Sequence, residues 1–287
     1  VLGLRICPDL DSVLYTLGGG ISQERGWGRE DESFRVRDEL AAYAASVGPA
    51  AQLVPSWFGL GDLDLATHLL RSSWLADGVA LSTVIRWLGE RWQTGITVVP
   101  ATDDDVETWV QLAEGSVHFQ EWWVRLRAAV PATGFDIRGA DAAKPAPGVL
   151  EAIESADVVM LAPSNPVVSI GVLLAIPGIA DALRSTSAPV VGLSPIVGGA
   201  PVRGMADSCL SAVGVETSAD AVARHYGLRR DGGLIDGWLV DEVDAAVVGH
   251  RVAEGFAARA VALMMTDVDA TAAMGASALE LVSGGVR

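Results

Sequence analysis

The spacing of apolar residues divides the chain into a mainly helical stretch and a longer part in which strand and helix patterns alternate. Between residues 33 and 92, apolar side chains recur at intervals of three and four residues, the period of a helix with one buried face. This spacing predicts amphipathic helices at about residues 33–46, 64–77 and 81–92. A short apolar helix is also predicted after Pro8, and it is expected to end at the glycines of residues 18–20.

Strand patterns begin after the helical stretch. Residues 95–100 carry strand signals, and residues 107–112 and 115–121 are typical of a β-hairpin. From residue 148 the expected order is helix 148–155, strand 158–161, helix 167–184, strand 189–193, helix 215–226 and strand 237–241. This alternation predicts an α/β fold with a doubly wound, mainly parallel sheet. We expect one domain over residues 1–287, with a helical insertion at about residues 33–92.

Two of the predicted strands end in loops that could bind a ligand. The apolar run of residues 156–162 stops at Pro163, Ser164 and Asn165, just before the next predicted helix. Backbone N–H groups at a helix start favour an anion, but an ordinary turn capped by Ser or Asn explains the same residues. The second loop, residues 194–204, is rich in Gly and Pro. Ligands of open α/β sheets bind at such strand ends.

The charge of the chain limits its partners. A formal net charge of −16 and a pI near 4.5 argue against nucleic acid and anionic membranes. A phosphorylated ligand would have to be held locally by backbone amides, a divalent metal or a few cationic side chains. Cys7 and Cys209 form no metal-binding or disulfide pattern, and neither a signal peptide nor a membrane-length apolar run is visible, so we expect a cytoplasmic protein.

Two carboxylates near the start of the chain have two possible roles. Asp9 and Asp11 follow Pro8 at the start of the first predicted helix, where either one could cap the helix. The same carboxylates could offer oxygen ligands to Mg²⁺, which takes one or two of them and leaves its other positions to water and phosphate. The spacing of the two residues leaves both roles open.

Four polar residues share one face of the helix predicted at residues 64–77. Asp64, Thr67, His68 and Arg71 lie at positions i, i+3, i+4 and i+7. A solvated polar face would explain this pattern, and so would a ligand site, because Gly61 just upstream allows a close backbone approach.

The second arm of the predicted hairpin combines a histidine with aromatic residues. Phe119, Trp122 and Trp123 follow His118 closely, and such neighbours usually form core or an interface. They could also provide a wall for a flat aromatic ligand. A histidine in this setting is more often a hydrogen-bonded structural residue than a catalyst.

Five motifs in this order resemble the 2-phospho-L-lactate transferase family (CofD/FbiA) of deazaflavin coenzyme biosynthesis. They are Pro-Asp-Leu-Asp-Ser-Val-Leu-Tyr from residue 8, Gly-Asp-Leu-Asp-Leu-Ala-Thr-His from residue 61, His-Phe-Gln from residue 118, Ala-Pro-Ser-Asn-Pro from residue 162 and the loop of residues 194–204. The likeness covers nearly the whole chain, and the sequence of residues 119–125 resembles the actinobacterial branch most.

The resemblance implies a Rossmann-like fold and a transfer reaction on a diphosphate. In this family the hydroxyl of the deazaflavin Fo attacks the phosphate next to the lactyl or enolpyruvyl group of a guanosine diphosphate conjugate. GMP leaves, Mg²⁺ assists, and the product belongs to coenzyme F-420 biosynthesis. The actinobacterial branch implies the phosphoenolpyruvyl donor, although the sequence itself does not choose between the two groups.

The resemblance also assigns roles to residues of this sequence. It implies that Asp11 is catalytic and that Asp9 and Asp11 hold Mg²⁺. It places the donor nucleotide at Pro163, Ser164, Asn165, Ser194, Pro195, Gly198, Arg203 and Gly204. The Fo or donor pocket is expected at Gly61, Asp62, Thr67, His68, Arg71, His118 and Gln120.

The chain departs from the family pattern at two places. The family begins with a strand, a Gly-rich phosphate loop and an acidic pair, and none of these precedes Val1, so we expect that an N-terminal segment is missing. Leu63 stands where the family pattern has a basic residue.

Two other functions remain open from the sequence. One is a non-catalytic, nucleotide-sugar-binding regulatory protein of the same superfamily. The other is an acidic α/β scaffold whose nine tryptophans serve an oligomer interface. Because Trp is enriched at such interfaces, a homodimer is expected with either the transferase or the scaffold.

Overall fold

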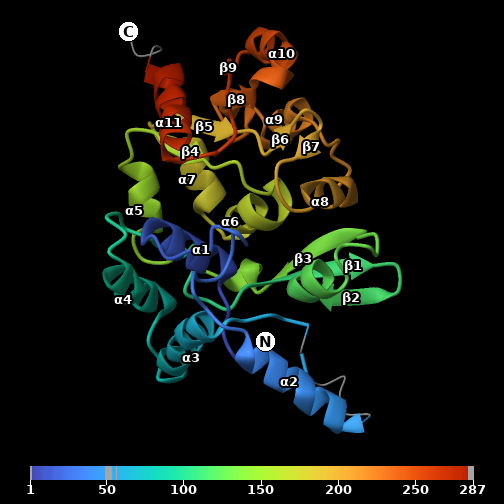
Figure 1. Ribbon diagram of the computed structural model, residues 1–287. Coiled ribbons are helices and arrows are strands. Elements are labelled where there is room, and N and C mark those ends of the chain that lie inside the picture. The colour runs from blue at the N-terminus through green and yellow to red at the C-terminus, as the bar shows by residue number, and fades with distance from the viewer. Residues whose placement is uncertain (1, 49–53, 56, 284–287) are drawn as a thin grey trace. The chain divides into compact units, whose positions relative to one another are not determined.

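The computed structural model describes residues 2–48, 54–55 and 57–283 and divides into two compact units, Val1–Asp103 and Asp104–Arg287. Figure 1 shows the chain coloured from the N-terminus to the C-terminus. Among these residues, no single helix has the length and hydropathy needed to cross a membrane. The segments Pro166–Ala175 and Ile179–Ser185 meet that test only together, and they are bent by 88° at their break.

The first unit is helical, as predicted. It contains α1 (Pro8–Leu17), α2 (Arg35–Ser46), α3 (Asp62–Ala76) and α4 (Leu81–Trp92). Proline in the first turn of α1 has its φ angle preset for a helix, and α1 ends at Gly18. Helix α3 begins two residues before its predicted start.

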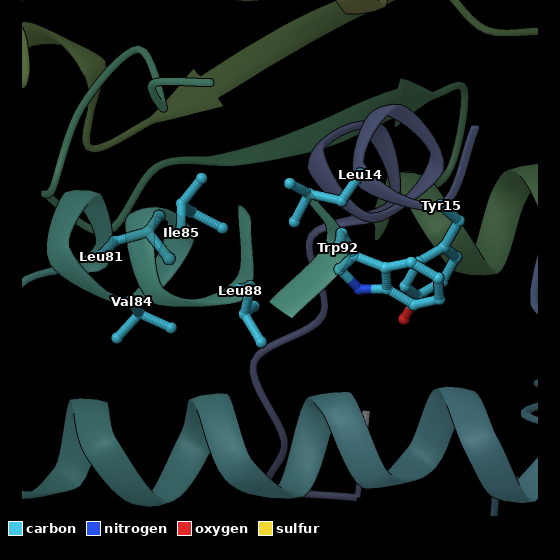
Figure 2. Close-up of a cluster of buried hydrophobic side chains, with 7 residues drawn as sticks. All are labelled: Leu14, Tyr15, Leu81, Val84, Ile85, Leu88 and Trp92. Atoms are coloured by element: carbon cyan, nitrogen blue, oxygen red, sulfur yellow. The ribbon is translucent and has the colours of Figure 1, made fainter. Parts of the chain in front are cut away.

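The core of the first unit lies between α1 and α4. Leu14 and Tyr15 of α1 pack against the apolar face of α4, where Trp92 lies with its ring centroid 5.0 Å from that of Tyr15 (Figure 2). A Cβ atom at Gly18 or Gly20 would lie 2.5 or 2.4 Å from the Trp92 ring. These two glycines therefore allow the chain to pass close to the indole. Full burial of each large apolar side chain in such a cluster is worth about 1.5–3 kcal/mol.

The second unit is built on a parallel sheet with the strand order β4-β5-β8-β9. The strands are β4 (Val159–Leu161), β5 (Val190–Leu193), β8 (Gly237–Asp241) and β9 (Ala257–Val261), and each neighbouring pair is parallel. Helix α5 (Val149–Glu154) precedes β4, and α11 (Val268–Ser283) follows β9. The connections between the strands contain η4 (Pro166–Ile170), α6 (Gly171–Ala175), α7 (Ile179–Ser185), α8 (Ala206–Ala212), α9 (Ala219–Tyr226) and α10 (Ala246–Glu254).

Helices cover both faces of this sheet, which confirms the doubly wound α/β prediction. Adjacent residues of a strand point to opposite faces. Leu239 of β8 packs in a cluster with Met274 of α11, whereas Trp238 donates its indole N–H to the carbonyl of Ala219 at the start of α9, at 3.1 Å. A Cβ atom at Gly192 of β5 would lie 2.6 Å from the Trp238 ring, so this glycine makes room for the indole.

The hairpin prediction is also confirmed. Strands β1 (Glu107–Leu112) and β2 (Gly115–His118) pair antiparallel, and β3 (Gly134–Arg138), which was not predicted, pairs with the other edge of β1. The second arm of the hairpin ends at His118 rather than at residue 121, and η2 (Glu121–Arg125) follows it.

Two secondary-structure predictions were wrong. Residues 95–100 belong to no strand of the described sheets. The single helix predicted at residues 167–184 is divided into η4, α6 and α7, and it breaks before Pro177, where Ile176 adopts an extended conformation. A residue before proline is driven out of the helical region by the proline ring, which explains the break.

Candidate functional site

One face of α3 carries a buried polar cluster, so the solvated-face interpretation was wrong. Asp64, Thr67, His68 and Arg71 lie on this face as predicted, and all four are buried. Asp11 of α1, with 4% of its surface exposed, faces Arg71, with 0%. Charged groups of this kind are almost never buried without a partner. The geometry of the cluster shows those partners.

Arg71 and Asp11 form a two-pronged ion pair. Nη1 of Arg71 donates to Oδ2 of Asp11 at 3.1 Å, and Nη2 donates to Oδ1. Nη1 also donates to the backbone carbonyl of Arg5 at 3.3 Å. Burial raises the pKa of Asp11, and the Arg71 guanidinium opposes that shift. Both carboxylate oxygens of Asp11 are therefore already used within the protein.

Asp64 joins the cluster through Tyr15 and His68. The Tyr15 hydroxyl donates to Oδ1 of Asp64 at 2.7 Å, and Nε2 of His68 lies 3.2 Å from the same oxygen. Nδ1 of His68 lies 3.2 Å from Nη1 of Arg71. Burial on its own would raise the pKa of Asp64, but His68 and Tyr15 outweigh it and hold that pKa below its usual value.

Asp11, Asp64 and His68 were tested as a metal site. One ligand atom from each lies within 4.8 Å of the other two, and Nε2 of His68 has no partner with hydrogen-bond geometry. However, Mg²⁺ takes about six ligands, almost all of them oxygen, and usually keeps several waters. Here Arg71 occupies both oxygens of Asp11, one of the three donors is a nitrogen, and the cluster is closed to solvent. This arrangement does not fit a resident Mg²⁺ ion.

Asp9, the other predicted metal ligand, lies outside the cluster. It is exposed in the first turn of α1, and no partner of its carboxylate is found among the residues that the structure describes. Its oxygens are therefore available to a cation that arrives with a ligand.

Gly61 and Asp62 fasten a loop to the start of α3. Asp62 accepts hydrogen bonds from the backbone N–H and the hydroxyl of Ser33, both at 2.8 Å, which lowers its pKa. A Cβ atom at Gly61 would lie 2.0 Å from the carboxyl carbon of Glu32. The close approach predicted for Gly61 is thus made by Glu32 of the same chain.

The loop after β4 forms a capped turn. Oδ1 of Asn165 accepts the N–H groups of Val167 at 2.9 Å and Val168 at 3.2 Å. These N–H groups are consequently not free for an anion. Pro163 and Ser164 are half-buried, and the Ser164 hydroxyl makes no hydrogen bond to any described residue. Of the two polar side chains in this loop, Ser164 is the one available to a ligand.

The loop after β5 begins with residues that stabilise its own turn. Ser194 and Pro195 are buried, and the Ser194 hydroxyl donates to the carbonyl of Ile196 at 2.8 Å. A small hairpin, β6 (Ile196–Val197) and β7 (Ala200–Pro201), follows. Its turn residue Gly198 has a φ of 58° and donates its N–H to Asp244 at 2.9 Å.

The end of the same loop carries an unpaired cation. Arg203 is exposed and forms no ion pair within the described part of the chain. Gly204, at a φ of 73°, passes so close to Trp123 that a Cβ atom would lie 3.0 Å from its ring. Arg203 is therefore free to bind an anion at the carboxyl end of β5.

His118 and its aromatic neighbours are mainly structural, as their pattern suggested. Nδ1 of His118 accepts the N–H of Gln120 at 3.2 Å, and burial lowers the pKa of the ring. Trp122 is fully buried and donates its indole N–H to Val130 at 2.8 Å. Trp123 is half-buried, so only part of the proposed aromatic wall could meet a ligand.

The comparison with protein families decides the assignment. The model of the 2-phospho-L-lactate transferase CofD family matches residues 1–280. The chain belongs to this family. The match confirms the resemblance inferred from the five motifs and makes the chain a member of a transferase family.

Relatives from actinobacteria have high identity to this member of the CofD family. A protein of Streptomyces griseus named phosphoenolpyruvate transferase is 59% identical over 98% of this chain and 86% of its own length. Proteins of the same name from Streptomyces coelicolor and Thermobifida fusca are 57% and 55% identical, over 98% of this chain and 86% and 83% of their lengths.

Solved structures show more distant likeness. A UPF0052-family protein of Bacillus halodurans is 20% identical over 84% of this chain and 73% of its own, with a TM-score of 0.45.

The sequence interpretation missed Tyr15, a member of the buried network in this CofD-family chain, and Glu32, which lies beside Gly61. Tyr15 lies four residues after Asp11 on α1, which places both on one helix face, so its role could have been inferred from spacing. Glu32 pairs with Arg25 at 2.7 Å beside Gly61, and nothing in the linear pattern indicates this contact.

Proposed function

We propose that the chain transfers a phosphoenolpyruvyl group from a guanosine diphosphate conjugate to the deazaflavin Fo in coenzyme F-420 biosynthesis. The observation that supports this most is the family match over residues 1–280, together with the names of relatives that are 53–59% identical. These names favour phosphoenolpyruvate over 2-phospho-L-lactate as the transferred group. They also favour an enzyme over a regulatory binding protein.

The reaction is a substitution at phosphorus. The Fo hydroxyl oxygen forms a bond to the phosphorus next to the enolpyruvyl group, the bond from that phosphorus to the bridging oxygen breaks, and GMP leaves with the bridging oxygen. The hydroxyl proton goes to solvent or to a basic group. Such reactions depend on alignment and charge neutralisation more than on covalent catalysis.

We assign the donor to the strand-end loops of the second unit. Arg203 supplies a cation without an intramolecular partner, and Ser164 supplies a free hydroxyl. Ser164 follows β4, and Arg203 follows β7 in the loop that leaves the carboxyl end of the neighbouring strand β5. A local cation matters here because the net charge of −16 repels an anionic donor. Pro163, Asn165, Ser194 and Gly198 maintain the shape of these loops.

Mg²⁺ is proposed to assist the transfer by neutralising phosphate charge. Asp9 is the residue of this chain best suited to hold it, because its carboxylate is exposed while that of Asp11 is bound to Arg71. We expect EDTA to abolish turnover and added Mg²⁺ to restore it. Turnover that persists in EDTA would remove Mg²⁺ from the proposal.

We also propose that the protein acts in the cytoplasm as a homodimer. Trp92, Trp122 and Trp238 are buried within the chain, so an interface would draw on the other six of its nine tryptophans. Light scattering tests the dimer, and a monomer mass at high concentration would exclude it.

Titration of Fo tests the function first. We expect saturable binding, followed by deazaflavin fluorescence, that responds to GDP. Turnover with the phosphoenolpyruvyl and 2-phospho-L-lactyl donors is then compared, using this chain and a chimera that carries the N-terminal residues of the Streptomyces griseus relative. Binding of nucleotide without turnover in both proteins would favour the regulatory function instead.

Arg203 provides a matched test of the donor site. Arg203→Gln removes the charge and is expected to weaken GDP binding by about 1.5–3 kcal/mol, the usual contribution of a hydrogen bond to a charged group. Ser164→Ala should lose about 0.5–1.5 kcal/mol, as expected for one neutral hydrogen bond. Arg203→Lys is the control that keeps the charge. Unchanged GDP affinity in Arg203→Gln would place the donor elsewhere.

A further inference from the structure

We propose that His68 is a positioning residue that is neutral, carries its proton on Nε2, and uses the lone pair of Nδ1 to hold Arg71 against Asp11. This inference rests on the proposed function in so far as Asp11 and the first turn of α1 serve the transfer. His68 itself is 1% exposed and so is not expected to touch a substrate.

The His68 ring contacts Arg71 on one side. Nδ1 of His68 lies 3.2 Å from Nη1 of Arg71. A guanidinium in a protein stays protonated and has only donors. If Nδ1 also carried a proton, two donors would face each other in a buried site. The contact therefore requires that Nδ1 be an acceptor.

The opposite side of the ring faces Asp64. Nε2 of His68 lies 3.2 Å from Oδ1 of Asp64, a carboxylate that has only acceptors when ionised. A neutral imidazole with an accepting Nδ1 has its proton on Nε2, where it faces this carboxylate. The contact with Asp64 lacks hydrogen-bond geometry, so Arg71 sets the tautomer and the nearby carboxylate is compatible with it.

An imidazolium between the carboxylates is the competing arrangement. Nδ1 lies 3.6 Å from Oδ2 of Asp11, which is too long for a good hydrogen bond. The guanidinium of Arg71 already balances Asp11. The charge of Asp64 is balanced in another way, by the Tyr15 hydroxyl at 2.7 Å and by its place in the first turn of α3, where the helix dipole favours an anion. A second buried cation beside Arg71 is not needed.

The consequence is a chain of contacts from α3 to α1. Nδ1 of His68 orients the guanidinium, and the guanidinium fixes both oxygens of Asp11. Asp9 lies two residues before Asp11 on the same helix. The ring of His68 would therefore set the placement of the turn that carries the exposed carboxylate.

Nitrogen NMR of the whole chain tests the protonation state directly. The chain has four histidines, and the His68 signals are identified by their loss in His68→Asn. At neutral pH we expect a proton on Nε2 and none on Nδ1. A signal from an imidazolium, or a proton on Nδ1, would overturn the proposal, and this readout does not depend on any transfer activity.

Turnover of two variants tests the positioning role. His68→Asn can place a carbonyl oxygen where Nδ1 was, whereas His68→Leu has a similar branched shape without an acceptor. We expect His68→Leu to lower kcat about tenfold to hundredfold below His68→Asn, with KM for the donor unchanged, because a hydrogen bond to a charged group is lost.

Circular dichroism establishes that both variants are folded before kcat is compared. Equal kcat in two folded variants would show that the acceptor has no positioning role. If His68→Leu does not fold, the proposal is still tested in two ways. The kcat of His68→Asn is compared with that of the wild type, and NMR reports the tautomer. The expected tautomer without turnover in either this chain or the chimera would refute the transferase and leave the His68 geometry standing.

Discussion

Asp11 illustrates how one contact changes the interpretation of a residue. The sequence motif allowed helix capping or Mg²⁺ binding, but the carboxylate is turned into the protein and bound by both prongs of Arg71. Desolvation of two charges nearly offsets their attraction, so a buried pair of this kind adds little net stability. Removal of one partner is a different matter, because it leaves the other charge buried and unpaired.

Variants of this pair should therefore be strongly non-additive. We expect Asp11→Asn to lower the free energy of unfolding by about 3–5 kcal/mol, since Arg71 keeps its buried charge. The double variant Asp11→Leu/Arg71→Met removes both charges. Its free energy of unfolding is expected to fall less than that of Asp11→Leu alone or of Arg71→Met alone. Urea unfolding of the set measures this coupling. A double variant that loses the sum of the two single losses would show that the pair is not coupled.

Cys209 gives a prediction of pH dependence. Burial raises the pKa of its thiol from 9.0 to about 11. Because the folded pKa lies above the unfolded one, the stabilisation from the buried neutral thiol is fully present below pH 9 and is lost as the pH rises through 11. The expected loss is about 2–3 kcal/mol.

The test compares urea unfolding of the wild type and Cys209→Ala between pH 8 and pH 11.5. This is about the range in which the Cys209 thiol titrates in the unfolded and in the folded protein. The difference in unfolding free energy between the two proteins should shift in favour of the alanine variant as the pH rises. Tyrosines and other groups titrate equally in both proteins and so cancel. A difference that stays constant would mean that the Cys209 thiol is not buried in its neutral form.

At the scale of elements, the packing of the preceding loop against the start of α3 requires a glycine, which has no side chain, at position 61. The Glu32 carboxyl packs directly on Gly61, and Asp62 binds Ser33 at the same place. Gly61→Ala is expected to lower the free energy of unfolding by about 1–3 kcal/mol, because the new methyl group must displace Glu32. Thermal unfolding measures the loss.

Gly59 is the matched control for that variant. A Cβ atom at Gly59 meets only the Arg37 side chain, at 3.7 Å, which is an ordinary contact. Gly59→Ala should therefore change stability by less than about 0.5 kcal/mol. Equal losses in both variants would show that helix propensity or loop entropy, rather than the Glu32 contact, governs this joint.

The elements that the sequence predicted well are those with strong local patterns. The runs that form β4 and β5 are apolar throughout, and that of β8 is apolar up to Asp241; β5 and β8 are also buried, as strands inside a parallel sheet are. Strand β9 was missed because Ala-Ala-Arg-Ala-Val has little strand propensity and gains its place from pairing with β8. The helix break before Pro177 was visible in the sequence and was overlooked.

The candidate site was predictable only in part, for a related reason. Helical spacing showed that Asp64, His68 and Arg71 share a face, which is local information. The partner of Arg71 lies 60 residues away on α1, and no spacing rule links the two. The motifs therefore named many of the right residues, while the contacts that decide their roles came from tertiary packing.

At the scale of the whole molecule, the net charge of −16 opposes the approach of an anionic donor. The field of the whole chain acts over a Debye length, whereas a single cation such as Arg203 acts at contact. Association of GDP should therefore be slow at low salt, and salt should accelerate it by screening the repulsion. Most proteins that bind phosphate groups through basic surfaces show the opposite dependence.

Stopped-flow measurements without Mg²⁺ test this expectation. Between about 0.01 and 0.15 M ionic strength the Debye length falls from roughly 30 to 8 Å, and we expect the association rate constant of GDP to rise several-fold. Guanosine is the control, because a neutral nucleoside should associate at the same rate throughout. Arg203→Gln should steepen the dependence, since it removes the local attraction and keeps the global repulsion. An association rate that falls with salt in the wild type would mean that cations around the donor site, rather than the net charge, dominate the field that GDP meets.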